Sequence, residues 1–344
     1  MPDPEVIRVV MEFRRRLLAL DSAAALQLVA AYGPIWARTR GAVDGLLAEV
    51  AERELTWSQT QRLGRLTDLL RQVQGEVAQY AATARGTITG AQRAAAGLSQ
   101  VAARQTVNAA LPPGITTELL ATAGIQWTTL PAQAFEVFVG LSGDGAPLGR
   151  LLQTLGAEAA AGVKEAIGLG IAQGQGPLKT ARLVRTNFGL PLTRSLTIAR
   201  TETLRSYREA SRLQYAANAA VVKGYRRVSA KDERVCMACI SLDDKEYSLG
   251  EALDEHVNGR CTLVPITVSY RDLGLKVDDA REPRETALEW FGQQPASTQE
   301  AMLGSAKYQA WQDGAFNLGD LAKVEHSPIW GDQAVEKTLA ELRG

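Results

Sequence analysis

Three cysteines and a histidine lie in one short segment of the chain. They are Cys236, Cys239, His256 and Cys261, with the spacing C-x2-C-x16-H-x4-C. A C-x2-C turn brings two thiolates to one metal ion, and tetrahedral zinc accepts a third thiolate and an imidazole as its remaining ligands. The spacing therefore favours a structural zinc site on these four residues, flanked by two short strands. Such a small unit needs a bound metal to be stable.

Two other interpretations of the cysteine segment stay open. The cysteines can be reduced and half-buried without any metal, or Cys236 and Cys239 can form a thiol-redox pair. The redox pair is the weaker of the two, because the sequence before Cys236 lacks the strand–helix pattern of a thioredoxin-like fold. A catalytic zinc is disfavoured as well, since we find no obvious general base within a few residues of His256.

Recognised catalytic motifs are absent from the sequence. It contains no P-loop, no G-x-S-x-G nucleophile elbow and no H-E-x-x-H. The run Asp254-Glu255-His256, followed by Asn258, loosely resembles a ββα-metal nuclease motif. Such a site needs a further metal-binding residue, and the other histidine, His326, lies far along the chain and is expected at the surface. The sequence predicts no catalytic residues.

The composition limits the class of protein. The 344 residues contain 38 Lys and Arg and 38 Asp and Glu, so the formal net charge of zero argues against a protein that coats nucleic acid. Hydrophobic residues make up 46% and charged residues 22%, which is typical of a globular chain. No apolar run reaches the roughly 18 residues of a membrane segment. Residues 1–16 lack the pattern of a signal peptide, and an odd number of cysteines favours a reducing compartment.

The elements that position the cysteine segment are predicted to be mostly helices. From Leu63 to Val101 apolar residues recur at alternating spacings of three and four, the pattern of a helix packed along one seam. Internal glycines cost about 1 kcal/mol each relative to alanine, so this helix must pack against a partner. The partner is either another part of the chain, in a bundle, or another protein, in an intermolecular coiled coil.

Further helices and two short strands are predicted downstream. Residues 148–172 and 192–219 have amphipathic helical patterns, and residues 224–229 and 262–265 alternate like strands on either side of the cysteines. Strand is expected only between Val222 and Val268.

The predicted fold class is mainly α, in three parts. Residues 1–140 form an N-terminal helical bundle or arm, and residues 148–268 form a helical core with a small β-hairpin Cys/His knuckle, an α+β unit. Residues 269–344 form a C-terminal tail of short helices.

Several motifs follow one another in a definite order. The first part of this series is Ile198-Ala-Arg-Thr-Glu202, Gly224-Tyr225, Asp232-x-Arg234-x-Cys236-x-x-Cys239 and His256-x-x-x-Arg260-Cys261. The second part is Trp290, Gln293-Gln294-Pro295, Leu303-Gly304, Lys307-Tyr308, Trp311 and Gly314. In this order the motifs resemble those of the phage Mu F-like minor head proteins, also called phage head morphogenesis proteins, and the resemblance covers about residues 150–322.

The chain departs from the family pattern in the histidine motif. The family has H-P-x-C-R-C, whereas here Val257 replaces the proline and Gly259 replaces the first cysteine. If that cysteine is a metal ligand in the relatives, either His256 substitutes for it or this chain binds no zinc.

The resemblance implies a structural role without enzymatic activity. It implies a minor head (capsid) protein of a tailed phage or prophage-like particle, acting at the portal vertex in head assembly and DNA packaging or delivery. The implied location is the virion, and the host cytoplasm during assembly. The implied partners are the portal protein and other head proteins. Arg14-Arg15-Arg16 and Arg226-Arg227 are candidates for local contacts with packaged DNA.

Five residues of the motifs are expected to have structural roles: Arg200, Glu202, Asp232, Arg234 and Arg260. Arg200 and Glu202 point to different faces of their helix, and we expect intramolecular pairing there that fixes the knuckle on the helix. Asp232 and Arg234 are expected to brace the cysteine turn.

The alternative function belongs to another class, a metal-dependent nuclease or toxin-type enzyme carried by a Mu F-like module. A simple DNA-binding zinc ribbon is disfavoured, because the segment from Lys231 to Glu255 is rich in acidic residues.

Overall fold

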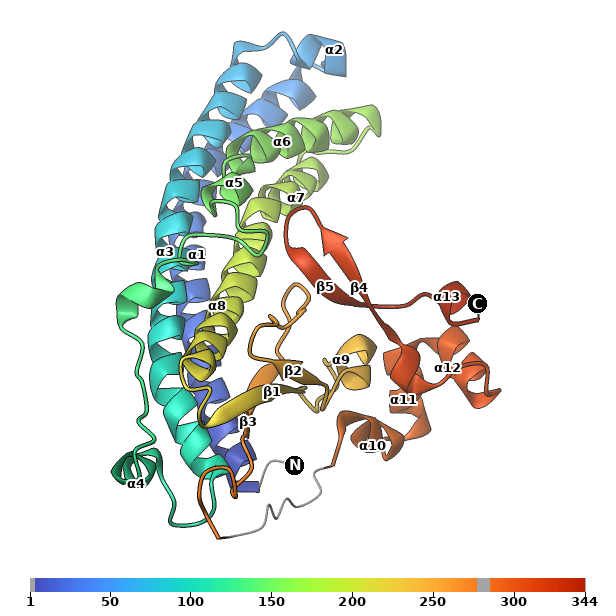
Figure 1. The fold of residues 1–344 in the computed structure, drawn as a ribbon. Helices are drawn as coiled ribbons and strands as arrows, with labels where there is room; N and C mark the ends of the chain where they lie inside the picture. Colours follow the sequence, from blue (N-terminus) through green and yellow to red (C-terminus); the bar gives the residue numbers. More distant parts are fainter. Residues whose placement is uncertain (1–3, 277–284, 344) are drawn as a thin grey trace.

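Two long antiparallel helices form the stem of the molecule (Figure 1). The computed structural model describes residues 4–276 and 285–343. Helix α1 (Pro4–Glu52) and helix α3 (Gly64–Ala110) are joined at one end by the short α2 (Trp57–Thr60). Helix α8 (Leu190–Ala216) packs along both of them. The chain is mostly helical, as its sequence predicts.

Helix α1 buries one stripe of side chains against the rest of the bundle. Val10, Phe13 and Leu17 are buried at helical spacing, and the stripe continues to Leu28. By length and composition alone this helix could also cross a membrane. Its buried stripe packs on α3 and α8, and it includes Asp21, which is ion-paired with Arg200 of α8. We therefore describe α1 as a core helix of the bundle.

The predicted seam of α3 lies inside the chain. Val73, Val77 and Tyr80 are buried and pack in a cluster with residues of α1, α6 and α8. After Ala91 the buried face moves away from the predicted positions, and Val101 is 49% exposed. A straight helix has 3.6 residues per turn, so a heptad pattern drifts off the buried face along its length. The seam is thus intramolecular core, as in the bundle alternative, and the intermolecular coiled coil is wrong.

The remaining helices of the bundle follow a long connection. This connection contains α4 (Thr117–Thr122) and the 3₁₀ turn η1 (Ala132–Phe135). The helix predicted over residues 148–172 is interrupted, giving α5 (Gly149–Leu152) and α6 (Leu155–Ala172), and α7 (Pro177–Phe188) leads into α8. One apolar cluster spans residues 28–88 and 148–199, so α1 and α3 share a core with α6, α7 and α8.

A three-stranded antiparallel sheet carries the cysteine segment. Its strands are β1 (Val222–Val228), β2 (Glu246–Ser248) and β3 (Thr262–Thr267), in the order β2-β1-β3. The two predicted strands are β1 and β3, which pair directly, and the short helix α9 (Met237–Ser241) lies between β1 and β2. We call residues 222–267 the knuckle.

The C-terminal part contains short helices and an unexpected hairpin. Its helices are α10 (Ala287–Gly292), α11 (Ala296–Leu303), α12 (Ser305–Gln312) and α13 (Leu339–Arg343), and its 3₁₀ turn is η2 (Leu318–Asp320). Strands β4 (Ala322–Ser327) and β5 (Gly331–Glu336) pair antiparallel.

The hairpin corrects the expectation that strand ends at Val268. Strand β4 is only partly buried, with Val324 53% exposed. It therefore lacks the pattern of buried apolar residues by which a strand is predicted from sequence. Tertiary contacts hold the hairpin instead. Trp330, at its turn, packs against the helical core, and the backbone N–H of Ala334 donates to the carbonyl oxygen of Asp254 in the knuckle at 3.2 Å.

Candidate metal centre

Helix α9 places the first two cysteines side by side. Cys236 is the N-cap residue of this helix, and its Sγ accepts a hydrogen bond from the backbone N–H of Cys239 at 3.4 Å. One helical turn therefore brings both thiols to the same side. Cys261 directly precedes strand β3, and His256 lies in the loop between β2 and β3.

The histidine closes the first group of donors. His256 Nε2 lies 3.2 Å from Cys236 Sγ and 3.2 Å from Cys239 Sγ. Zinc bonds of about 2.0–2.3 Å separate the ligands of a tetrahedral site by roughly 3.5 Å. His256 Nδ1 lies 2.8 Å from the carbonyl oxygen of Val257, which fixes the proton on Nδ1 and leaves Nε2 free for a metal.

A second group of donors shares Cys239 with the first. The ligand atoms of Cys239, Glu255 and Cys261 lie within 4.8 Å of one another, as do those of Cys236, Cys239 and His256. The four residues selected by spacing thus gather around Cys239, in an arrangement that could hold a metal ion such as zinc. Glu255 is a fifth donor that the spacing argument missed, although it directly precedes His256 in the sequence.

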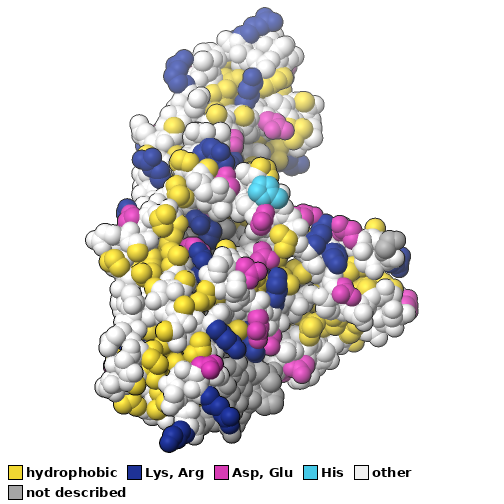
Figure 2. All heavy atoms as spheres, in the orientation of Figure 1, with side chains coloured by type: hydrophobic (Ala, Val, Ile, Leu, Met, Phe, Trp, Pro, Cys, Tyr) yellow, Lys and Arg dark blue, Asp and Glu magenta, His cyan; other side chains and the backbone are white. Residues whose placement is uncertain are grey.

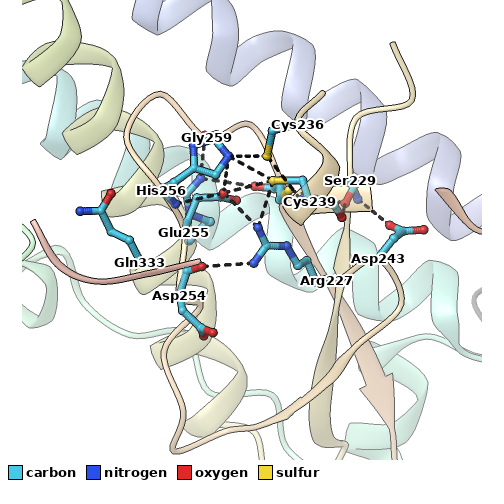
Figure 3. Close-up of polar contacts among 12 residues, drawn as sticks. Arg227, Ser229, Cys236, Cys239, Asp243, Asp254, Glu255, His256, Gly259 and Gln333 are labelled. Atoms are coloured by element: carbon cyan, nitrogen blue, oxygen red, sulfur yellow. Dashed lines mark hydrogen bonds and ion pairs between the residues drawn. The ribbon is translucent and has the colours of Figure 1, made fainter. Parts of the chain in front are cut away.

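A buried arginine lies beneath the cluster (Figure 3). The side chain of Arg227 is 0% exposed, and its Nη2 lies 3.2 Å from Cys239 Sγ and 3.0 Å from Glu255 Oε1. Its Nη1 donates to the carbonyl oxygen of Asp254 at 3.2 Å. The expectation that Arg226-Arg227 touches phosphates is therefore wrong. Arg227 points inward, and Arg226 is mostly buried and paired with Glu246.

A second buried arginine joins the cluster to helix α8. Arg208 is 6% exposed and donates to the carbonyl oxygens of Gly259 and Cys261, each at 3.3 Å. The backbone N–H of Asn258 donates to Thr201 Oγ1 of the same helix at 3.1 Å. These hydrogen bonds hold the loop that contains His256 against helix α8.

Residues 161–264 match the family model described as Phage Mu protein F like protein. This segment belongs to the Mu F-like family. It runs from within α6 to within β3, so it contains α7, α8 and all five candidate donors. Neither the curated proteins nor the solved structures gave a match.

The thiols of the Mu F-like segment have unequal acidities. The hydrogen bond between Cys236 and Cys239 lowers the pKa of Cys236 and raises that of Cys239. The hydrogen bond with Cys239, together with burial, raises the pKa of Cys261 well above its ordinary value. A metal ion bound here would displace thiol protons, so binding would release protons.

The surroundings of His256 and Glu255 shift both pKa values toward the charged forms. Burial alone would lower the pKa of His256, but the hydrogen bond with Cys239 and the charge of Glu255 raise it to about 9. Burial alone would raise the pKa of Glu255, but the charges of Arg227 and Arg208 outweigh it and lower that pKa. The carboxylate is therefore ionised although its side chain is only 2% exposed.

Arg200 and Glu202 connect helix α8 to parts of the chain outside the knuckle. Arg200 donates to Asp21 of α1 at 2.8 and 2.9 Å. Glu202 is fully buried, pairs with Arg205 at 2.7 Å, and accepts from the backbone N–H of Gly143 at 3.1 Å. The expectation that these residues hold the knuckle is wrong. Arg208 and Thr201 on the same helix do so.

The aspartate of the D-x-R-x-C motif braces the cysteine turn. Both carboxylate oxygens of Asp232 accept from Arg260 at 2.6 Å, and the backbone N–H of Arg234 donates to Asp232 at 3.0 Å. This bidentate pair links the turn before Cys236 to the residue before Cys261. Arg234 contributes its backbone, and its side chain is exposed.

The second histidine stays away from the cluster. His326 is on the hairpin, its side chain is 73% exposed, and its Nδ1 lies 2.8 Å from Asp332. It is a surface residue, as expected, and it supplies no ligand to a ββα-metal nuclease site.

Proposed function

We propose that the protein is a structural minor head protein of a tailed phage or prophage-like particle, acting at the portal vertex in head assembly and DNA packaging or delivery. This proposal rests on the contacts of the charged motif residues in the Mu F-like segment. Arg200, Glu202 and Asp232 each link one element of the chain to another. Charged residues that connect parts of the fold through ion pairs and hydrogen bonds support a structural role without enzymatic activity.

The metal in this proposal is a structural zinc. The donors come from α9, from the β2–β3 loop and from the start of β3, so one ion would join three pieces of chain that contain little regular structure. Thiolate and imidazole donors suit zinc, and such an ion supplies folding free energy directly.

Proteins, rather than DNA, are the proposed main partners. Figure 2 shows basic and acidic side chains interspersed over this face, without one continuous basic surface. Of the candidate phosphate contacts, Arg227 is buried, whereas Arg15 and Arg16 of α1 are exposed. The portal and other head proteins are therefore the expected neighbours within the virion, with DNA a local contact.

Copurification with the portal ring tests this proposal. Tagged portal protein, expressed with the full chain, should retain it, and heads assembled without the chain should be defective. A head fraction of normal composition and infectivity in its absence would contradict the proposed role.

A cleft next to the cluster favours the second candidate, a metal-dependent nuclease or toxin-type enzyme. The cleft has a volume of about 670 Å³, and Glu202, Arg208 and Tyr247 are among its lining residues. Burial raises the pKa of Glu202 although Arg205 opposes the shift, and a perturbed carboxyl group in a cleft is a candidate for catalysis. Loss of nuclease activity in a stably folded Glu202→Gln variant would support this candidate over the first.

A further inference from the structure

Glycine at position 259 leaves a space that the side chain of Glu255 fills. A Cβ atom built on Gly259 would lie 2.3 Å from Cγ, Cδ and Oε1 of Glu255. Gly259 has no positive φ angle, so its backbone is open to other residues. Space, rather than conformation, requires glycine here.

The carboxylate in this space has an unused oxygen. Glu255 Oε1 accepts from Arg227 at 3.0 Å, whereas Oε2 is buried without a hydrogen-bond partner among the described residues. A buried carboxylate oxygen without a partner costs stability, because it has lost its hydration. A cation bound by this carboxylate would reduce that cost, because it would neutralise the buried negative charge.

The other oxygen, Oε1, which already accepts from Arg227, is spaced like a ligand. Glu255 Oε1 lies 3.6 Å from Cys239 Sγ and 3.5 Å from His256 Nε2, close to the separation of about 3.5 Å between ligands of one tetrahedral zinc. In Figure 3 the side chains of Cys239, Glu255 and His256 lie together, with Cys236 and Arg227 alongside. The ligand atom of Glu255 lies within 4.8 Å of those of Cys239 and Cys261, so joining the group with Cys236 requires the carboxylate to move toward that thiol.

We propose that Glu255 is an oxygen ligand of the metal held by Cys236, Cys239 and His256, and that Gly259 leaves room for its carboxylate. Two thiolates, one carboxylate, a neutral imidazole and Zn²⁺ carry a net charge of −1, which the buried Arg227 offsets. Cys261 then remains a neighbouring thiol, 3.6 Å from Ser229 Oγ. This inference rests on the structural metal of the proposed function.

Metal titration of the full chain tests the ligand assignment. Zn²⁺ affinity is measured by competition with a chromophoric chelator, and Co²⁺ is used as the spectroscopic probe. Glu255→Gln should lower Zn²⁺ affinity more than about 100-fold, since losing an outer-shell partner alone costs about 10–100-fold. It should also shift the Co²⁺ ligand-field bands. Asp254→Asn, next to it in the same loop, is the matched control and should change neither.

Gly259→Ala provides a second test in which every ligand residue and Arg227 keep their identity. Its methyl group should displace the carboxylate and reproduce the Co²⁺ spectral shift of Glu255→Gln, with helical circular dichroism unchanged. Cys261→Ser should leave the Co²⁺ bands in position. If Co²⁺ bands move in Cys261→Ser and stay in place in Glu255→Gln, the fourth ligand is Cys261 and the proposal is wrong. A wild-type chain that binds no metal would also overturn it, while portal binding remains a separate measurement.

Discussion

The helical bundle and the knuckle are stabilised in different ways. The bundle buries aliphatic and aromatic side chains, with Val77 and Ile88 both 0% exposed. The knuckle buries charge, with Arg227 and Glu255 at 0% and 2% side-chain exposure, beside three cysteines. The free energy gained from apolar burial grows with the area buried, whereas a buried charge is stable only while its partners are present. The bundle should thus respond to volume and polarity, and the knuckle to charge, metal and pH.

The largest effect is expected from a charge placed in the bundle. Val77→Asp should lower the free energy of unfolding by about 5 kcal/mol or more, because the core around Val77 offers an aspartate no partner. Val101→Asp is the matched control, since Val101 lies on the same predicted seam but is 49% exposed, and it should change stability by about 0.5 kcal/mol at most. Urea denaturation measures both. Equal effects would mean that the seam is buried along its whole length.

Removal of the buried charge in the knuckle should have the next largest effect. Arg227→Gln should cost about 3–5 kcal/mol, because it leaves the Glu255 carboxylate buried without its counter-charge. The side chain of its neighbour Arg226 is 12% exposed and pairs with Asp244 and with Glu246, which are 27% and 58% exposed, so Arg226→Gln should cost less, about 1–2 kcal/mol. Thermal denaturation of the two variants measures the difference, and similar melting temperatures would contradict the buried-charge description.

Metal removal should separate the two regions. A chelator should destabilise the wild-type chain by about 2.7 kcal/mol if free zinc was at 100 times its dissociation constant. A milder bundle variant, Val77→Ala, should lose the same increment on chelation, because Val77 belongs to the bundle cluster and not to the knuckle. Calorimetry with and without chelator checks this. An increment that vanishes in Val77→Ala would mean that the two regions are coupled.

The smallest effect is expected at the edge of the knuckle. The hydrogen bond from Arg260 lowers the pKa of Asp232, so the pair adds stability above the unfolded value of about 3.9 and loses it as pH falls through the lower folded pKa. Because the Asp232 side chain is 42% exposed, solvent screening limits this to about 1 kcal/mol or less. Asp232→Asn should therefore be slightly destabilising at neutral pH and neutral in strong acid. A constant difference across that range would show that the charge is not responsible.

The sequence predicted the elements better than their partners. The spacing of Leu66, Val73 and Val77 indicated a packed helix, and most of the predicted seam up to Ala91 is buried, with Leu70 and Thr87 partly exposed. The C-x2-C turn and the later His and Cys indicated a cluster, and the structure brings them together around Cys239. The division into residues 1–140, 148–268 and 269–344 stays a prediction. The β4–β5 hairpin was missed because its strands carry little apolar alternation.

Local rules determined the helices, the strands beside the cysteines and the donors of the candidate metal centre, because periodicity and side-chain chemistry act over a few residues. Only the tertiary structure decided which charges are buried. Arg227 and Arg226 are adjacent and chemically identical, and the pairing of β1 with its neighbours turns Arg227 toward the buried Glu255 and Arg226 toward the exposed Glu246. Burial is set by the elements that cover a side chain, and these come from residues far away in the sequence.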